Sequence, residues 1–419
     1  MIFLCYFLIF STIAQPALFS PYLGEARVFL ILSAIVCIAA YKKQKEPGWW
    51  KNIPQNKLIV LMLLAYTLSE AQHLWLGGTI NTFVFWFNKV LIYYAVLVFI
   101  DTPARLKTAV WMSVLASTVL AYFALEYYLA DPTLAQFEGR LQSVGNYNLS
   151  NSYALLLTVI WPLAFVLFEL EKSVLRKIFL AALMAVFLYF DFLTKSRGGI
   201  LGMTVAICLS FIMSRKIAKH KFVKAAFIAC VLLVVLVYGL AFIKQRTDIG
   251  DSLGDDVSST DRLMAWVAAT KMLVAHPIIG VGWQRFPDVV TDYGSDRHML
   301  AHNTIISVFA ETGLFGGIVF MLILKNSISQ LYKTYRESAV GDVVSQKGIL
   351  AQGLFISLAA FLVNTSFSVK DHDPCYWLII ALTAAGTRII NKKEYSLEGS
   401  AGLNTYEEAY SYNSSAAKS

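Results

Sequence analysis

The chain has 419 residues, of which 57% are hydrophobic and 15% are charged, and its mean hydropathy is +0.60. Soluble domains carry about 25% charged and about 45–50% apolar residues, so this composition excludes a soluble globular protein. The pI near 9.0 comes from lysines and arginines dispersed over short loops, which favours control of membrane topology over nucleic-acid binding.

Twelve apolar runs follow one another along the chain, and most are long enough to span a membrane. Backbone polar groups in lipid must be paired within the protein, and the runs are too long for barrel strands, so they predict helices. The sequence therefore predicts an all-α, polytopic membrane helix bundle of about 12 transmembrane helices. The expected helices cover residues 2–20, 25–41, 58–76, 79–100, 107–129, 150–169, 176–193, 199–214, 223–243, 303–324, 348–366 and 374–390.

One long polar loop, residues 244–302, divides the chain and is expected to contain short helices. Nine expected helices precede it in residues 1–243, and three follow in residues 303–390. Residues 391–419 are polar, and we expect a disordered tail. The first apolar run lacks a basic flank and a clear small-residue cleavage site, so we expect a retained helix and not a signal peptide.

Lysines and arginines set the expected orientation of the bundle. If the N-terminus is cytoplasmic, 23 of them lie in the inner loops and the tail, and 11 lie on the outer side. Six of those 11 belong to the long loop, and long loops are largely exempt from the positive-inside rule. We therefore expect both termini in the cytoplasm and the long loop in the periplasm or outside the cell.

A short outer hairpin, residues 194–199, places Lys195 and Arg197 against this trend. Gly198 and Gly199 let the backbone turn tightly and approach a ligand closely. The two cations fit an anionic ligand, and they fit contact with lipid headgroups equally well. Farther upstream, the amide-rich outer loop 131–149 adds Arg140 to the cations expected on this side.

The long loop holds a predicted amphipathic helix over residues 259–275, which would lie on the membrane surface or on the bundle. Arg262 is in its first turn, and Pro277 ends it before a tight turn at Gly280 and Gly282. We expect Trp266 to serve packing alone. The residues that share the apolar face are Leu263, Trp266, Val267, Thr270 and Val274.

His302 precedes the tenth expected helix. An imidazole exchanges a proton near neutral pH and so suits a general base, although a lone histidine at a helix start more often makes only structural hydrogen bonds. Asn303, the next residue, suits either a helix cap or a sugar contact. Glu311 lies nine residues after His302, about 13 Å along a helix, which is too deep for direct contact unless the helix bends.

Four charged residues lie within apolar runs and are expected to face the bundle interior. A pairing of Glu70 with Lys89 on adjacent helices would explain two of them. A translocation path through these charges would instead make the protein a transporter or flippase for a polyanionic lipid. The four residues are Glu70, Lys89, Asp191 and Glu311.

Taken together, these pieces resemble the O-antigen ligase and O-antigen polymerase superfamily. The resemblance covers about residues 195–320 and rests on the hairpin, the loop helix, the glycine turn and the block after His302. The matching residues are Ser196-Arg197-Gly198-Gly199, Arg262 with Trp266, His276-Pro277-Ile278-Ile279-Gly280-Val281-Gly282 followed by Phe286, and His302-Asn303 with Glu311-Thr312-Gly313 and Gly316.

The resemblance implies a metal-independent membrane glycosyltransferase, without a cofactor, at the periplasmic face of the bacterial inner membrane. Its donor would be an undecaprenyl-diphosphate-linked glycan and its acceptor a hydroxyl of lipid A–core. Polymerisation of glycan repeats and transfer to a protein hydroxyl are the alternatives, because all three share the donor. Asp371-His372-Asp373 is spaced like a metal-binding pair and argues against metal independence, but a polar turn before Pro374 explains it too.

The departing diphosphate gains negative charge, and without a metal this charge must be neutralised by arginines. The resemblance assigns that role to Arg197 and Arg262, with Lys195 and Arg140 assisting. His302 would take the proton from the acceptor hydroxyl. Further substrate contacts are expected from Asn303, Gly280, Gly282 and Glu311.

Overall fold

The structure is a computed structural model that describes residues 2–15, 33–35, 37–38, 41, 53–130, 136–137, 140–214, 259–340 and 343–389. The expected helix at 223–243, most of the one at 25–41 and the expected tail lie outside the described residues. The same holds for the first part of the long loop, so the predicted division into four parts stays a prediction.

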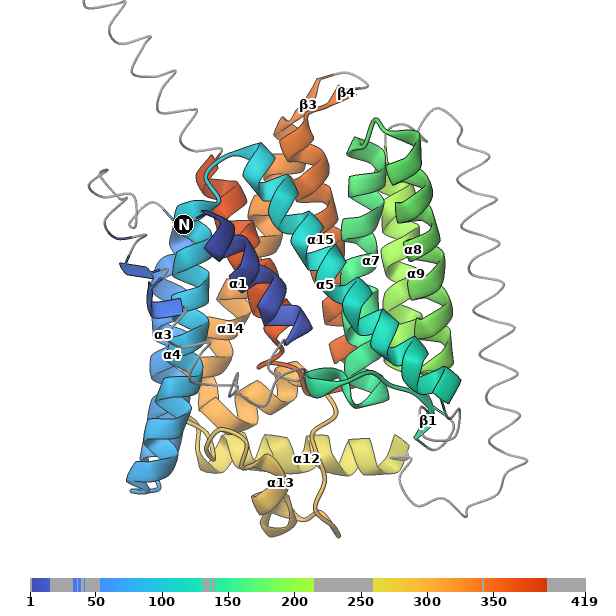
Figure 1. Ribbon diagram of the computed structural model, residues 1–419. Coiled ribbons are helices and arrows are strands. Elements are labelled where there is room, and N and C mark those ends of the chain that lie inside the picture. Colours follow the sequence, from blue (N-terminus) through green and yellow to red (C-terminus); the bar gives the residue numbers. More distant parts are fainter. Residues whose placement is uncertain are drawn as a thin grey trace, which may run out of the picture.

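The described chain forms a bundle of roughly parallel helices with almost no strand (Figure 1). Five of its helices are long and apolar enough to cross a membrane: α4 (Leu76–Phe99), α5 (Pro103–Ala130), α7 (Ser150–Leu170), α14 (Thr304–Glu337) and α15 (Gln346–Thr365). The predicted all-α membrane class is therefore confirmed, and the count of 12 spans stays a prediction. The other bundle helices are α1 (Ile2–Ala14), α3 (Pro54–Ala71), α8 (Val174–Leu193), α9 (Arg197–Met213) and residues 374–389.

Helix starts follow simple capping chemistry. Ser196, Asn303 and Ser345 each accept a hydrogen bond from a backbone N–H three residues on, which satisfies a donor that the helix itself leaves free. Pro54 and Pro103 stand at the starts of α3 and α5, where a missing N–H costs nothing. Two antiparallel hairpins of two-residue strands complete the fold: β1 (Gln136–Phe137) with β2 (Arg140–Leu141), and β3 (Ala339–Val340) with β4 (Val343–Val344).

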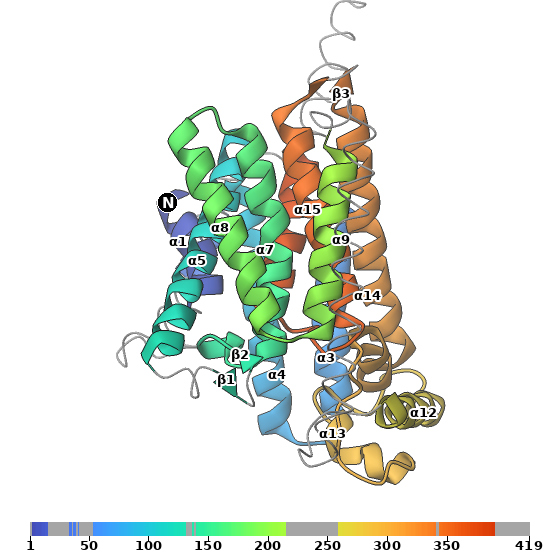
Figure 2. The same ribbon diagram turned by 90° about the vertical axis from the view of Figure 1, so that its right-hand side faces the viewer.

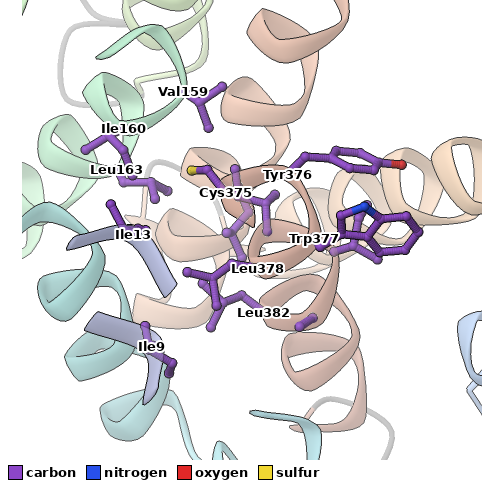
Figure 3. Packing of buried hydrophobic residues seen from close by; sticks show 14 of the residues in the cluster. Ile9, Ile13, Val159, Ile160, Leu163, Cys375, Tyr376, Trp377, Leu378 and Leu382 are labelled. Atoms are coloured by element: carbon purple, nitrogen blue, oxygen red, sulfur yellow. The ribbon is translucent and has the colours of Figure 1, made fainter. Parts of the chain in front are cut away.

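α7 is the central helix, buried along almost its whole length by α5, α8, α9 and α15. Small residues allow this close approach. A Cβ at Gly202 of α9 would lie 2.7 Å from the Thr158 side chain of α7, and one at Gly353 of α15 would lie 2.6 Å from Val166. Figure 3 shows how α1, α7 and the last helix meet through aliphatic side chains, with Ile13, Leu163 and Leu378 among them.

The two ends of the bundle carry different segments. The start of α1, the end of α4 and the β3–β4 hairpin lie at one end (Figure 1). Arg388 donates to the Leu97 carbonyl near the end of α4. The hairpin at 194–196 and α12 (Ser259–Ala275) lie at the other end of the bundle, which we call the α12 end (Figures 1 and 2). The positively charged residues that the sequence grouped on the outer side thus share one end of the bundle.

α12 lies across the bundle axis and is seen almost end-on in Figure 2. Its packed face consists of Ala265, Ala268, Ala269 and Met272. The bulky stripe, for which the sequence left both the membrane surface and the bundle open, points away from the bundle, and Leu263 and Val274 are 60% and 76% exposed. The prediction that Trp266 serves packing alone is wrong. The residue is 36% exposed, and its Nε1 donates to the Ala301 carbonyl at 2.9 Å. This bond ties α12 to the segment before His302.

α14 is broken at Gly313, whose φ of 65° and ψ of −165° are not helical. The loop segment after α12 repairs the break with four backbone hydrogen bonds. Leu314 and Phe315 donate to the carbonyls of Pro277 and Ile278, while Val281 and Gly282 donate to the carbonyls of Ala310 and Glu311. We call these two paired segments, 277–282 and 310–315, the Gly280–Gly313 junction.

Two glycines of the junction, Gly280 and Gly313, are required by its geometry. Gly280 has φ +70°, and a Cβ there would lie 2.3 Å from the carbonyl carbon of Glu311. A Cβ at Gly313 would lie 2.4 Å from the carbonyl carbon of Ile278. The obstructing atoms are backbone on both sides, so neither segment can move aside without breaking the junction. The long loop is therefore attached to α14 by its main chain.

Candidate active site

A polar cleft opens at the α12 end, where the 194–196 hairpin, the first turn of α12 and the end of α15 meet. We call it the arginine cleft. Four of its side chains are cationic, and no carboxylate lines it among the residues that the structure describes. Its lining consists of Arg140, Asn151, Lys195, Ser196, Arg197, Gly198, Arg262, Asn364, Phe367 and Ser368.

The hairpin presents Lys195 and Arg197 through a tight local turn. Thr194 donates through its Oγ1 to the Asp191 carbonyl at 2.6 Å and accepts from the Ser196 N–H at 3.2 Å. Lys195 takes a left-handed backbone conformation, with φ of 50°. Ser196 then caps α9, accepting from Gly199 N. Both cationic side chains are exposed on the cleft side of this turn.

The two hairpin glycines have different neighbours. Gly198 lines the cleft, where a Cβ would lie 2.8 Å from the Asn364 carbonyl oxygen. A Cβ at Gly199 would instead lie 2.7 Å from both Ala154 and an Asp191 carboxylate oxygen, inside the bundle. Gly199 therefore serves helix packing, and only Gly198 matches the expected approach to a ligand.

Arg140 fastens the outer loop to the hairpin and to α7. Its Nε donates to the Thr194 carbonyl at 3.0 Å, and its Nη2 donates to Asn151 Oδ1 at 2.6 Å. These bonds fix the guanidinium at the edge of the cleft while its charge stays available there. The structure thus brings Arg140 to the same cleft as Lys195 and Arg197, as expected.

Arg262 approaches the cleft from α12. Its guanidinium lies over the Phe367 ring, 5.6 Å from the ring centre, and its Nε is buried without a partner among the described residues. Partial burial lowers the pKa of Arg262, and the positive charge of Arg197 lowers it further. Two like charges in a partly desolvated site repel each other, so a bound anion would stabilise the pair.

His302 lies beside Arg262 and not in the lining of the cleft. Partial burial lowers the pKa of His302, the charge of Arg262 lowers it further, and Asp261 acts in the opposite direction. The imidazole is therefore neutral near pH 7 and able to accept a proton. Its backbone is left-handed, with φ of 48°, and is held by the Asn303 cap on the following side.

Asn303 is engaged on both ends of its amide. Its Oδ1 accepts from Ile306 N at 3.1 Å, and its Nδ2 donates to the Ser366 carbonyl at 3.5 Å. Of the two roles that the sequence left open, the structure shows the helix cap. Thr304 Oγ1 donates to the Ser368 carbonyl at 2.8 Å, so the His302 segment is also attached to the turn after α15.

Gly280, Gly282 and Glu311 lie in the Gly280–Gly313 junction and are not among the residues that line the arginine cleft. Glu311 is 4% exposed and accepts from Gln284 N at 3.1 Å and from Phe286 N at 3.4 Å. A Cβ at Gly282 would lie 2.7 Å from Nε2 of His73. Their surroundings therefore point to holding the loop in place, where the sequence suggested substrate contact.

The expected pairing of Glu70 with Lys89 is wrong. Glu70 accepts from Arg285 of the long loop, at 3.0 Å from Nε and 2.6 Å from Nη2. Lys89 instead lies with its Nζ 4.6 Å from the centre of the Phe85 ring. Arg285 thus gives the loop a second attachment, since a bidentate pair fixes orientation as well as distance.

The Asp371-His372-Asp373 turn faces the protein. Asp371 accepts from the Tyr66 hydroxyl at 2.7 Å and lies 3.2 Å from His372 Nδ1. Asp373 accepts from Cys375 N at 2.8 Å, at the start of the last helix. Among the described residues, no group of three or more His, Cys, Asp and Glu side chains is arranged to hold a metal ion.

Residues 179–321 match the model of the O-antigen ligase family. The matched segment contains the hairpin, α12, the Gly280–Gly313 junction and His302. This match confirms the resemblance of the chain to the O-antigen ligase superfamily. Members of this superfamily are membrane glycosyltransferase-like enzymes, which agrees with the helical bundle described above. No curated protein matches the chain.

Part of the arginine cleft comes from outside the matched segment. Arg140 and Asn151 precede it, and Asn364, Phe367 and Ser368 follow it. Of these five residues, only Arg140 was among the expected site residues. The only local signal for the last three is a short polar run, 364–368, at the end of an apolar helix.

Proposed function

We propose that the protein transfers a glycan from undecaprenyl diphosphate to a hydroxyl of lipid A–core, in lipopolysaccharide biosynthesis at the periplasmic face of the bacterial inner membrane. The observation that supports this most is the convergence of Arg140, Lys195, Arg197 and Arg262 on one cleft, with neutral His302 beside Arg262. A diphosphate carries negative charge that would balance these four cations. The reaction class, glycosyl transfer, is taken from the matched family.

The reaction breaks the bond between the anomeric carbon of the glycan and a phosphate oxygen. The electron pair stays on that oxygen, and the guanidinium groups of Arg197 and Arg262 offset the new charge. His302 accepts the proton of the acceptor hydroxyl as its oxygen forms the new glycosidic bond. Undecaprenyl diphosphate then leaves. If the acceptor attacks from the face opposite the leaving group, the anomeric centre is inverted.

Two acceptors other than lipid A–core use the same donor chemistry. A polymerase would attach the glycan to another carrier-linked chain, and a protein glycosyltransferase would use a side-chain hydroxyl. The arginine cleft serves the donor in all three, so the acceptor must be identified by assay. A transporter for a polyanionic lipid is the alternative from another functional class. Against it, Glu70 accepts hydrogen bonds from Arg285, so its carboxylate is not open to a translocation path.

The direct test is glycan transfer in vitro with purified protein, carrier-linked glycan, lipid A–core and EDTA. Wild type is compared with Arg262→Ala and His302→Ala. Transfer by wild type, with both variants inactive, would support a metal-independent ligase that uses both residues. Longer glycans on the carrier would identify a polymerase. No product of either kind, with or without added divalent metal, would contradict the proposal and favour a protein acceptor or a transporter.

A further inference from the structure

The end of α15 forms the wall of the arginine cleft that faces the hairpin. Asn364 lies in its last turn, and Phe367 and Ser368 follow directly. α9 approaches this wall closely, because a Cβ at Gly198 would lie 2.8 Å from the Asn364 carbonyl oxygen and one at Gly202 would lie 3.3 Å from the Asn364 Cβ. The side chain of Asn364 is thereby held next to Arg197 and Gly198 in the lining of the cleft.

Two polar side chains of this wall are buried and unpaired. Asn364 is 1% exposed and Ser368 is 7% exposed, yet Asn364 Nδ2 and Ser368 Oγ have no hydrogen-bond partner among the described residues. A buried donor without a partner lowers stability, so such groups are retained where a ligand or water satisfies them. Arg262 Nε, in the same cleft, is also buried and unpaired.

The three unpaired atoms share one chemistry. The amide N–H of Asn364, the hydroxyl of Ser368 and the Nε–H of Arg262 can all donate a hydrogen bond. The cleft around them carries four cations and, within the described chain, no carboxylate that could accept. A ligand that satisfies all three must present several acceptor oxygens and negative charge, which a diphosphate does and a neutral sugar does not.

We propose that Asn364 and Ser368 are phosphate-binding residues that donate hydrogen bonds to the diphosphate of the lipid-linked donor. This inference rests on the proposed function, since the donor of that reaction supplies the diphosphate. The arginines supply charge, and these two neutral donors orient the diphosphate from the α15 wall of the cleft. Because the diphosphate is present before and after transfer, their loss raises KM for the donor more than it lowers kcat.

The first experiment measures binding of farnesyl diphosphate to the purified full-length protein in detergent. Asn364→Leu and Ser368→Ala are each expected to weaken binding roughly tenfold or more, the usual loss for a hydrogen bond to a charged group. Asn364→Asp, which replaces the donor with a negative acceptor, should weaken it further. Ser368→Thr keeps the hydroxyl and should restore binding. Farnesol, which lacks the diphosphate, should bind all variants with the same low affinity.

Gln352 offers a matched control on the same helix. It is 2% exposed and its Nε2 is also unpaired, but it does not line the cleft. Gln352→Leu should leave farnesyl diphosphate binding unchanged. Thermal unfolding separates binding from structure: Asn364→Leu removes a buried unpaired donor, so its Tm should equal or exceed that of wild type. A lower Tm together with lost binding would assign Asn364 to the fold and overturn its proposed role.

Failure of this inference differs from failure of the proposed function. If Arg262→Ala weakens farnesyl diphosphate binding but Asn364→Leu and Ser368→Ala bind as wild type does, the inference is overturned and the transfer reaction stands. If wild type does not bind the probe, the inference is overturned as well. Loss of binding in both variants, in a protein that transfers no glycan, would support the phosphate site and contradict the proposed reaction.

Discussion

Asp261 and Arg262 place opposite charges beside the imidazole of His302. Asp261 raises the pKa of His302, whereas burial and Arg262 lower it. If neutral His302 accepts the proton of the acceptor, transfer falls as the pH drops through this pKa, because imidazolium cannot accept a proton. Asp261→Asn removes the charge that favours imidazolium, so the acidic limb of kcat/KM should move to lower pH.

The control for this profile is Asp292→Asn, an exposed carboxylate in the short helix η4 (Val290–Tyr293) of the same loop. It should leave the acidic limb in place. Asp261 also pairs with Arg297 at 2.5 Å, so the Tm of Asp261→Asn is measured alongside to exclude partial unfolding. A limb that moves to higher pH, or that moves equally in the control, would argue against His302 as the base.

Arg262 is the second residue whose role can be measured singly. Arg262→Ala should lower kcat by about 10²–10³, the usual effect of removing one group that stabilises developing charge. Arg262→Lys should recover only part of this, because an ammonium lacks the planar fork of a guanidinium. Lys271→Ala, on the same helix with its Nζ donating to the Tyr293 carbonyl, serves as control. Equal activity of Arg262→Ala and Lys271→Ala would remove Arg262 from the mechanism.

At the scale of elements, the Gly280–Gly313 junction decides whether the long loop stays attached to α14. Gly280→Ala and Gly313→Ala each force a Cβ to within 2.5 Å of opposing backbone. Each should lower the free energy of unfolding by more than about 2 kcal/mol, since both left-handed strain and a backbone clash are introduced. Thermal unfolding of the purified variants measures the effect.

Gly294 provides a control that has left-handed backbone strain but no backbone clash. Its φ is +96°, but a Cβ there would meet only Lys271 Nζ, the mobile end of a flexible side chain. Gly294→Ala should therefore cost only about 1–2 kcal/mol, the usual penalty for left-handed backbone with a Cβ. If all three variants unfold at the same temperature, the junction contributes nothing beyond the backbone preference of its glycines.

The elements that the sequence predicted best are those with a strong local signal. α12 and the hairpin at 194–199 have capping residues, prolines and glycines at their ends, and the structure has them where expected. α14 was expected to end near residue 324 but continues to Glu337, because its later turns still bury one face, with Leu331 and Tyr335, while the other side of the helix is polar. The interruption of this helix at Gly313 was not predicted from the sequence.

The candidate site was predictable only in part. Its arginines stood out because cations are rare at outer loops of such a chain. Arg285 pairs with Glu70, 215 residues away, and Asn364 lines the same cleft as Arg262, which lies far from it in sequence. No local pattern carries such pairings, since they depend on how α3, α9 and α15 are arranged around α14. Lys89, the opposite charge within the next apolar run, was for that reason the wrong partner for Glu70.

At the scale of the whole molecule, the two ends of the bundle should lie on opposite sides of the membrane. We expect the α12 end in the periplasm. Asp296→Cys, exposed beside η4, should react with a membrane-impermeant maleimide in intact spheroplasts. Glu337→Cys, exposed at the end of α14, should react only after permeabilisation.

The native cysteines set the background of this labelling. Among the described cysteines, Cys5, Cys37 and Cys375 are buried and Cys208 is only partly exposed, while Cys230 lies outside the described residues. Wild type therefore reports the signal to subtract. The reverse pattern, with Glu337→Cys labelled in intact spheroplasts, would invert the expected orientation. Labelling of both positions before permeabilisation would contradict the prediction that the two ends lie on opposite sides of the membrane and that α14 spans it.

The Gly280–Gly313 junction also determines how chimeras of this superfamily should be made. A graft that exchanges only residues 244–302 would place a foreign main chain against a native partner, because residues 277–282 bond to residues 310–315 beyond the loop. The exchangeable unit therefore extends at least through Phe315. A graft of this larger unit, made to move acceptor preference between relatives, takes both halves of the junction from one parent. A shorter graft takes them from two.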